Sequence, residues 1–283
     1  MSTKSNLPAK AADNPDSHVM PLIDHLMELR RRLIFSIAFL ILAFLGCYHF
    51  SEHIYGFLVQ PLADAEALIG GPKRMIYTHL AEAFVTQIKV TFFAAAFLTF
   101  PIFSNQIWKF VAPGLYRHEK NAILPFLFSA PILFFMGGAL AYYVVMPLAW
   151  QFLLGFQTTA SESVLPIQLE ARVGEYLSIA MTLLFAFGLA FQMPVLLILL
   201  ARVGVLTSAG LASKRRYAII LMFIFAAVVT PPDVVSQLSL AVPMCILYEL
   251  SIIGARMVEK KREEEASADG NDTSAEDTDF NTA

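Results

Sequence analysis

Residues 176–201 read YLSIAMTLLFAFGLAFQMPVLLILLA, a run of mostly apolar side chains without a single charge. A helix rises about 1.5 Å per residue and the hydrocarbon layer of a bilayer is about 30 Å thick, so roughly 20 apolar residues span it. This run is therefore long enough to cross a membrane as one helix. The whole chain agrees, because 57% of its residues are hydrophobic and only 15% are charged, unlike a typical soluble domain.

Further charge-free windows lie at residues 33–51, 90–108, 121–161, 217–232 and 234–248. The third is too long for one crossing. We expect Pro147 to end its helix, because proline donates no backbone hydrogen bond. Residues 148–161 are then expected to lie along the outer interface or to fold over the domain. The last two windows are short and are separated by Pro231-Pro232-Asp233, which predicts a hairpin of two short helices with Asp233 capping the second. The predicted fold class is an all-α integral membrane protein with six transmembrane helices.

The basic residues predict the orientation, because cytoplasmic loops are enriched in lysine and arginine. With six crossings, sixteen of the 20 lysines and arginines fall on one side of the membrane. An even number of crossings puts both termini on that same side, so both are predicted to be cytoplasmic. Residues 1–19 are polar and lack the apolar core of a signal peptide, so none is expected. We predict a disordered N-terminus at 1–19, a six-helix transmembrane domain at 20–256 and a disordered acidic tail at 257–283, since that tail is acidic and nearly free of aromatic residues.

The sequence offers little catalytic or cofactor chemistry. Cys47 and Cys245 both lie inside apolar windows and resemble small core residues, and the six histidines show no spacing typical of metal ligands. No nucleotide-binding or hydrolase motif is present. We therefore expect no catalytic residues, no metal, no cofactor and no nucleic-acid partner, and predict that the protein is not an enzyme.

Four polar residues fall at membrane depth, where ionisable side chains often mark an ion path. Glu82 and Lys89 lie near the outer start of the second span, and we interpret them as an interfacial pair with the lysine directed outward. Asp233 is explained by its role as a helix cap. Gln192 lies two residues before Pro194, whose ring leaves a backbone carbonyl without its partner. The Gln192 amide either satisfies that carbonyl or has a function, and the sequence leaves both readings open.

Two carboxylates are predicted on the cytoplasmic face. Glu28 lies on the polar side of an amphipathic helix that leads into the first span, where it can form an ordinary i, i+4 pair with Arg32. Glu119 precedes the third span, where the positive end of the helix favours an acidic residue. Together with Gln106 and Phe110, these carboxylates form a surface that could bind two guanidinium groups and a short apolar segment.

Five motifs, in this order, resemble the TatC family of the twin-arginine protein translocase: HLMELRRR at 25–32, QIWKFVAPGLYRHEK at 106–120, ALAYYVVMPLAW at 139–150, AFGLAFQMPV at 186–195 and TPPDVVSQ at 230–237. The resemblance covers nearly all of residues 20–256. It implies a multi-pass receptor in the bacterial inner membrane that binds twin-arginine signal peptides of folded cargo. Export driven by the proton-motive force, and self-association in the receptor complex, are expected of the assembled translocase.

The resemblance also implies roles for individual residues. Glu28 and Glu119 match acidic positions implicated in arginine recognition, and the matching binding positions of the first cytoplasmic loop are Gln106, Phe110 and Pro113. Asp233 and Gln237 match the hairpin where the single-span subunits TatA and TatB are thought to dock. From the residues themselves we add Thr230 and Gln192 as polar groups that a partner helix could use.

The chain departs from the family pattern at one position, and the sequence leaves one rival function open. Many family members carry a glutamate where this chain has Gln192, and a glutamine cannot titrate, so a mechanism that protonates this site is in doubt. The rival function is a secondary carrier of a small solute, with Gln192 and Asp233 lining its site. An intramembrane hydrolase is less favoured, because no nucleophile–base pair is evident.

Overall fold

A computed structural model describes residues 22–69, 74–111, 120–158, 165, 169–230 and 233–279. Within these residues the protein is helical, and five helical stretches are long and apolar enough to cross a membrane. They are α1 (Leu22–His49), α3 (Glu82–Val111), the rod of α4 (Lys120–Leu140), η4 (Ala141–Val145) and α5 (Met146–Leu154), the pair α6 (Val173–Ala190) and α7 (Met193–Arg202), and α10 (Val234–Asp279). The predicted all-α membrane class is confirmed; the count of six spans and the side of the termini stay predictions.

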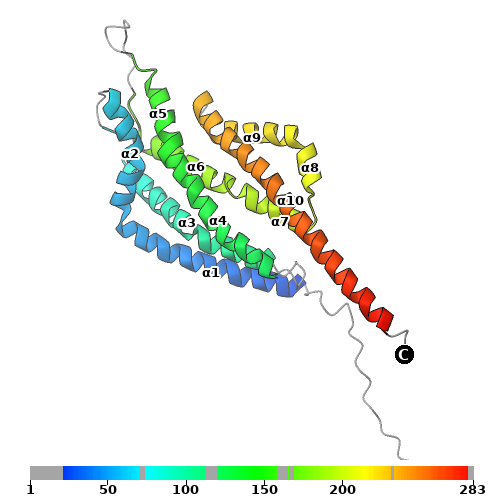
Figure 1. Ribbon diagram of the computed structural model, residues 1–283. Helices are drawn as coiled ribbons and strands as arrows, with labels where there is room; N and C mark the ends of the chain where they lie inside the picture. The colour runs from blue at the N-terminus through cyan, green and yellow to red at the C-terminus, as the bar shows by residue number, and fades with distance from the viewer. Residues whose placement is uncertain are drawn as a thin grey trace, which may run out of the picture.

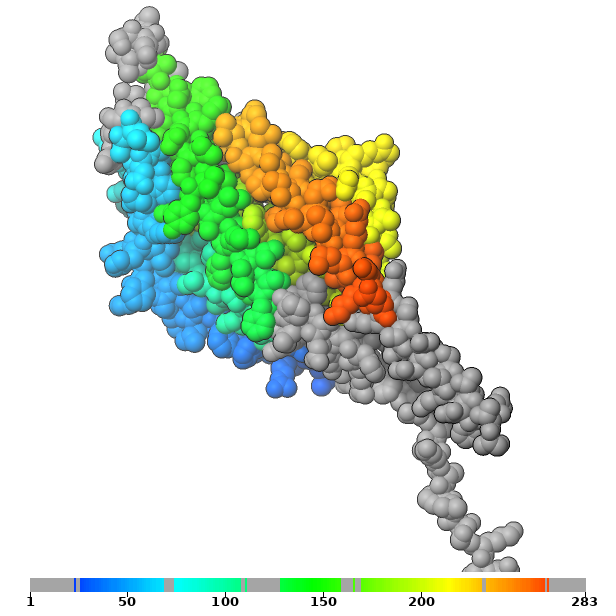
Figure 2. Space-filling model, viewed as in Figure 1, coloured from blue at the N-terminus to red at the C-terminus, as the bar shows by residue number. Residues whose placement is uncertain are grey.

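The helices form one bundle with α2 (Ser51–Ile69) at one end (Figure 1). α1 packs along α3, α3 and α4 pack against α6, and α7 packs against α10. Figure 2 shows the rod α4–α5 and α10 side by side on one face of the molecule. The end of the bundle that carries α2 and the starts of α3 and α6 is called the α2 end.

The rod α4–η4–α5 corrects the expectation that Pro147 ends a helix. The chain continues as helix through Pro147 to Leu154, because a π-helical turn precedes the proline. In this turn the Met146 N–H donates to the Ala141 carbonyl oxygen, five residues back. A π turn widens the helix locally, which relieves the clash of the proline ring with the preceding turn and accommodates its missing N–H.

Helix α2 was not predicted from the sequence, and two tyrosines from other helices hold it in place. Pro61 lies inside α2 and cannot donate to the Phe57 carbonyl, four residues earlier. The hydroxyl of Tyr142 in η4 donates to this carbonyl oxygen at 2.7 Å, and the hydroxyl of Tyr176 in α6 donates to the Leu58 carbonyl oxygen at 2.8 Å. The Phe57 carbonyl that the proline leaves open and the neighbouring Leu58 carbonyl thus attach α2 to the bundle.

Glycines allow α4 and α6 to approach closely. A Cβ atom at Gly137 of α4 would lie 2.5 Å from the Phe187 carbonyl oxygen, and a Cβ atom at Gly188 of α6 would lie 2.6 Å from the Phe134 ring. Phe134 and Phe187 are both fully buried. Small residues at such positions let membrane helices pack backbone to backbone, where dispersion contacts supply the stability.

The predicted hairpin forms, but its second helix differs in length from the prediction. α9 (Arg215–Val229) has 15 residues and covers about 22 Å, whereas the part of α10 that could cross a membrane runs for 29 residues, from Val234 to Arg262. The helix continues through Glu249, the charge that closes the predicted window, and the Glu249 carboxylate pairs with Arg215 of α9 at 2.8 Å. α10 continues to Asp279, past the predicted tail boundary at 257, with an i, i+4 contact of 3.8 Å between Lys260 and Glu264.

Candidate functional site

The first site joins the start of α1 to the end of α3. The Nε of Arg32 donates to Oε1 of Glu28 at 3.0 Å, and a second, shorter contact runs from Nη2 of Arg32 to the same oxygen. The Nη1 of Arg32 donates to Oε1 of Gln106 on α3 at 3.3 Å. The side chains of Arg32 and Glu28 are 21% and 25% exposed, so the pair is partly desolvated and still open to water. The expected i, i+4 pair of Glu28 is therefore present, and it extends to the predicted binding residue Gln106.

The remaining predicted residues of this site are only partly described. Phe110 lies one turn beyond Gln106 on α3 and is partly buried. Glu119 and Pro113 lie outside the described residues, so the structure does not test whether they join the cluster. The structure thus brings Glu28 and Gln106 together through Arg32, an arrangement that spacing within α1 alone does not reveal.

The second site is the hairpin of α9 and α10. Oδ1 of Asp233 accepts a hydrogen bond from the Ser236 N–H at 2.7 Å, which makes Asp233 the predicted helix cap. Oγ1 of Thr230 donates to the Ala226 carbonyl oxygen at 2.9 Å, and Nε2 of Gln237 donates to the Phe223 carbonyl oxygen at 3.3 Å. Of these three contacts, the Gln237 bond joins α10 to α9, while the Thr230 and Asp233 bonds stabilise the end of α9 and the start of α10.

Gln192 satisfies a carbonyl in another helix. Its Nε2 donates to the carbonyl oxygen of Ala130 in α4 at 2.8 Å. One of the two readings left open by the sequence has the amide pair with the carbonyl that Pro194 frees, which belongs to Ala190 in its own segment. The structure does not show that pair, because the break between α6 and α7 turns the Gln192 side chain toward α4.

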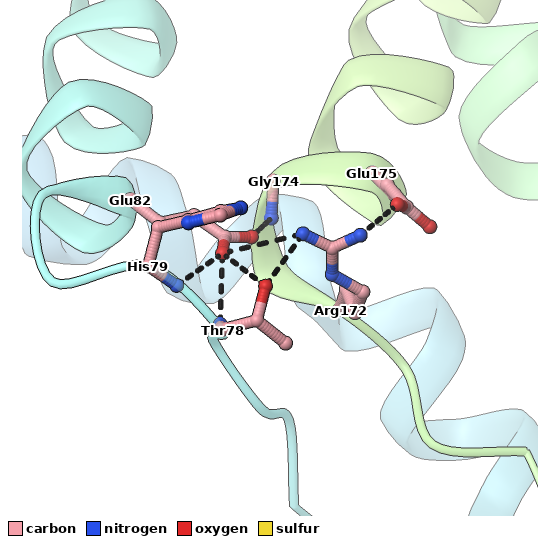
Figure 3. Close-up of polar contacts among 6 residues, drawn as sticks. All are labelled: Thr78, His79, Glu82, Arg172, Gly174 and Glu175. Atoms are coloured by element: carbon pink, nitrogen blue, oxygen red, sulfur yellow. Dashed lines mark hydrogen bonds and ion pairs between the residues drawn. The ribbon is translucent and has the colours of Figure 1, made fainter.

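A third cluster lies at the α2 end and replaces the expected pair of Glu82 with Lys89 (Figure 3). Oε2 of Glu82 accepts from the Thr78 N–H at 2.9 Å and lies 3.6 Å from Nη2 of Arg172, while Oε1 accepts from the Gly174 N–H at 3.2 Å. Arg172 also bonds Glu175 at 2.5 Å. Glu82 therefore joins the starts of α3 and α6 rather than pairing with Lys89.

A backbone bridge explains this exchange of partners. The Ile76 N–H donates to the Ala171 carbonyl oxygen at 2.9 Å, and the Val173 N–H donates to the Ile76 carbonyl oxygen at 3.0 Å. This bridge brings the first turn of α6 to Glu82, where free N–H groups and the helix dipole favour a carboxylate. Sequence reasoning missed the cluster because its members are far apart in the chain; the only local signal was an acidic residue in the first turn of a helix.

The helix arrangement and the three clusters can be compared with known proteins. Residues 24–243 match the family described as Sec-independent protein translocase protein (TatC). This chain belongs to the TatC family. It is 50% identical over 249 residues to the Sec-independent protein translocase protein TatC of Magnetococcus marinus (strain ATCC BAA-1437 / JCM 17883 / MC-1), covering 88% of this chain and 89% of the relative. The corresponding protein of Rickettsia prowazekii (strain Madrid E) is 44% identical over 240 residues, which cover 84% of this chain and 94% of that one.

A solved structure agrees with this assignment. The crystal structure of the "Twin Arginine Translocase Receptor- TatC" matches with a TM-score of 0.70 and 33% sequence identity, over 83% of this chain and 99% of that chain. The predicted resemblance to TatC is thereby confirmed. A TatC-family chain is a component of a protein translocase in the inner membrane, not an enzyme, so the predicted main function is also confirmed.

No metal chemistry is evident in the part of the chain that the structure describes. Within those residues, no group of three or more histidine, cysteine, aspartate or glutamate side chains could hold a metal ion. The three clusters above instead offer hydrogen bonds and charge, which suits recognition of a peptide or a partner helix.

Proposed function

We propose that this TatC-family chain binds twin-arginine signal peptides of folded cargo through Glu28 and Glu119, with Gln106, Phe110 and Pro113 completing the surface. The observation that supports the role of Glu28 most directly is its contact with Arg32. The Glu28 carboxylate already accepts two N–H groups of a guanidinium, and the same guanidinium reaches Gln106. The geometry around Glu28 is thus suited to the chemical group that an arginine of the peptide would present.

The binding free energy of such a contact is large enough to select Arg-Arg signal peptides over Lys-Lys peptides. Hydrogen bonds to charged groups contribute about 1.5–3 kcal/mol when desolvated, and less at a partly exposed site such as this one. About 1.4 kcal/mol per arginine already corresponds to a tenfold change in affinity. A lysine ammonium lacks the planar fork of the guanidinium, so two carboxylates can prefer Arg-Arg over Lys-Lys.

We infer that TatA and TatB dock on the hairpin near Thr230, Asp233 and Gln237, and that Gln192 contributes to assembly. The face of α9 that supports this proposal carries large apolar side chains that are more than half exposed, namely Ile220, Leu221, Ile224 and Val228. A short helix with an exposed apolar face leaves room for a single partner span, and one interhelical hydrogen bond in a membrane contributes about 1 kcal/mol.

We further propose that both termini are cytoplasmic and that the receptor complex contains several copies of this chain. Cargo export would use the proton-motive force through the assembled complex. A secondary carrier is not supported, since both Gln192 and Asp233 use side-chain atoms for structural hydrogen bonds.

The test compares binding of Arg-Arg and Lys-Lys signal peptides to the purified full-length protein. We expect wild type to prefer Arg-Arg, and Glu28→Gln and Glu119→Gln each to weaken that binding by roughly tenfold. Glu52→Gln is the matched control, because Glu52 is exposed on α2 at the far end of the bundle. Equal binding of both peptides by wild type, or full Arg-Arg binding by the double variant, would overturn the proposal.

A further inference from the structure

Two neighbouring hollows at the α2 end share two residues, Lys89 and Ser178. The larger has a volume of about 1010 Å³ and is lined mostly by apolar side chains of α1, α3, α6 and α9, among them Phe44, Phe92 and Phe185. The smaller, of about 520 Å³, is lined by residues that include the charged or polar side chains of His79, Glu82, Arg172 and Glu175. Lys89 and Ser178 thus join the larger hollow, an open apolar depression called the channel, to the smaller open hollow with the charged side chains, called the polar chamber.

Lys89 is the charged group at this junction. It lies two helical turns after Glu82, about 10 Å further along α3, and is exposed on the surface of the bundle. Its natural counter-ion, Glu82, is engaged by Arg172 and by backbone N–H groups, and among the described residues no ion pair or hydrogen bond reaches Lys89. An ammonium at this depth is unfavourable unless it reaches water or an anion.

The polar chamber holds charges of both signs. Glu82 and Glu175 oppose Lys89 and Arg172, and Nε of Arg172 is buried without a hydrogen-bond partner among the described residues. A ligand that fits must therefore carry an anionic group for Lys89, must not add a large net charge, and must have an apolar part that extends into the larger hollow.

We propose that these two hollows bind a zwitterionic phospholipid of the leaflet at the α2 end, with its phosphate on Lys89 and an acyl chain along Phe44, Phe92 and Phe185. A compact ammonium suits a phosphate oxygen, because it acts as a point charge with three donors. The amino group of the lipid then lies beside the acidic side chains of the chamber. The basic-residue distribution predicts this leaflet to be the outer one.

A lipid matches these hollows better than a partner helix does. A helix that filled the apolar hollow would need an acidic residue at the depth of Lys89 and would leave the polar chamber empty. A phospholipid supplies the anion, the polar head and the apolar chain in one molecule, in the order in which the hollows present them. The walls of the larger hollow include α1 and α9, and both helices carry exposed apolar side chains, as expected where acyl chains surround the protein.

The test is native mass spectrometry of the purified full-length protein, titrated in detergent with dioleoyl phosphatidylethanolamine. Dioleoylglycerol provides the chains without the phosphate, and glycerophosphoethanolamine provides the head group without the chains. We expect one tightly retained phosphatidylethanolamine and at least tenfold weaker binding of either fragment, because each fills only one hollow. Equal retention of dioleoylglycerol would show that Lys89 does not read a phosphate and would overturn the proposal.

Variants locate the site. Lys89→Gln should lower phosphatidylethanolamine retention about tenfold, Lys89→Arg should keep it, and Ser178→Phe should block it by narrowing the junction. Lys214→Gln is the matched control, since Lys214 is exposed and lines neither hollow. A thermal unfolding scan of each variant without added lipid confirms that the fold is intact.

One further measurement tests whether a partner helix, rather than a lipid, occupies the hollows. A photo-crosslinking residue at position 92 should capture lipid in native membranes. Capture of a protein span instead, or unchanged retention by Lys89→Gln, would overturn the lipid site. Both readouts are independent of signal-peptide binding, so they leave the receptor proposal untouched.

Discussion

The Nε of Arg32 donates to Oε1 of Glu28 at 3.0 Å, one helical turn away along α1. A guanidinium of the protein itself thus occupies the carboxylate that is proposed to bind an arginine of the signal peptide. An incoming arginine must either displace Arg32 or share Glu28 with it. Under this proposal, the contact with Arg32 sets the resting affinity of the site as well as its geometry.

The first prediction concerns this competition. Arg32→Gln should raise the affinity for an Arg-Arg peptide by up to about tenfold, because it frees a partly desolvated carboxylate. Arg31→Gln removes the same charge from an exposed neighbour and serves as the control in a peptide-binding titration. A loss of affinity as large as that of Glu28→Gln would show that Arg32 positions the carboxylate and does not compete for it.

The second prediction uses the proline of α2. Tyr142→Phe should destabilise the protein by about 1 kcal/mol, because the Phe57 carbonyl loses the hydroxyl that replaces its missing helical partner. In a Pro61→Ala background the alanine N–H can satisfy that carbonyl, so the same change should cost little. A double-mutant cycle from thermal unfolding measures the coupling. If Tyr142→Phe lowered the free energy of unfolding equally in both backgrounds, the Tyr142 hydroxyl would not be replacing the hydrogen bond that Pro61 cannot make.

The third prediction concerns the approach of α4 and α6. Gly137→Ala should destabilise by about 1–3 kcal/mol, because the new Cβ would meet the Phe187 backbone at 2.5 Å, and a backbone atom cannot move aside cheaply. Gly46→Ala is the matched control, because a Cβ at Gly46 finds nothing within 4 Å. Unfolding temperatures in detergent compare the two variants, and similar values would argue against close packing at Gly137.

A pH dependence is expected from Glu66 on α2. Its side chain is 7% exposed, and burial raises the pKa of its carboxyl. A raised folded-state pKa contributes stability that is present below the unfolded pKa of about 4.3 and is lost as the pH rises through the folded value. Glu66→Gln should therefore stabilise the protein at neutral pH and not at pH 4.

The measurement for Glu66 is the unfolding temperature as a function of pH. We expect Glu66→Gln to raise the unfolding temperature at neutral pH and to leave it close to the wild-type value at pH 4. Glu52→Gln, on an exposed part of the same helix, should leave the pH profile unchanged. A constant difference between Glu66→Gln and wild type at all pH values would rule out the titration of Glu66.

The last prediction separates the two readings of Gln192. Because Nε2 of Gln192 donates to the Ala130 carbonyl oxygen at 2.8 Å, Gln192→Leu should weaken the contact between α4 and α7 and impair assembly with partner subunits. A glutamate at this position can donate the same hydrogen bond only when its carboxyl group is protonated. Gln192→Glu should therefore retain function as long as that group is protonated. Co-purification of the partners and export of a twin-arginine cargo measure the effect. Normal assembly of the leucine variant would show that the residue is only tolerated.

The sequence by itself determined the membrane class, the family and most of the candidate site residues. Apolar runs such as 176–201 must be buried in lipid as helices whatever their neighbours are, because backbone groups need partners there. Local chemistry likewise decided that Asp233 caps α10 and that Glu28 pairs with Arg32, since both contacts lie within one turn.

Only the tertiary structure decided which distant groups meet. Glu82 binds Arg172 rather than Lys89 because a backbone bridge brings α6 to α3. Likewise, α2 is held in place because Tyr142 reaches a carbonyl left open by Pro61. Such contacts join segments far apart in the chain, and their energies exist only once the helices are packed.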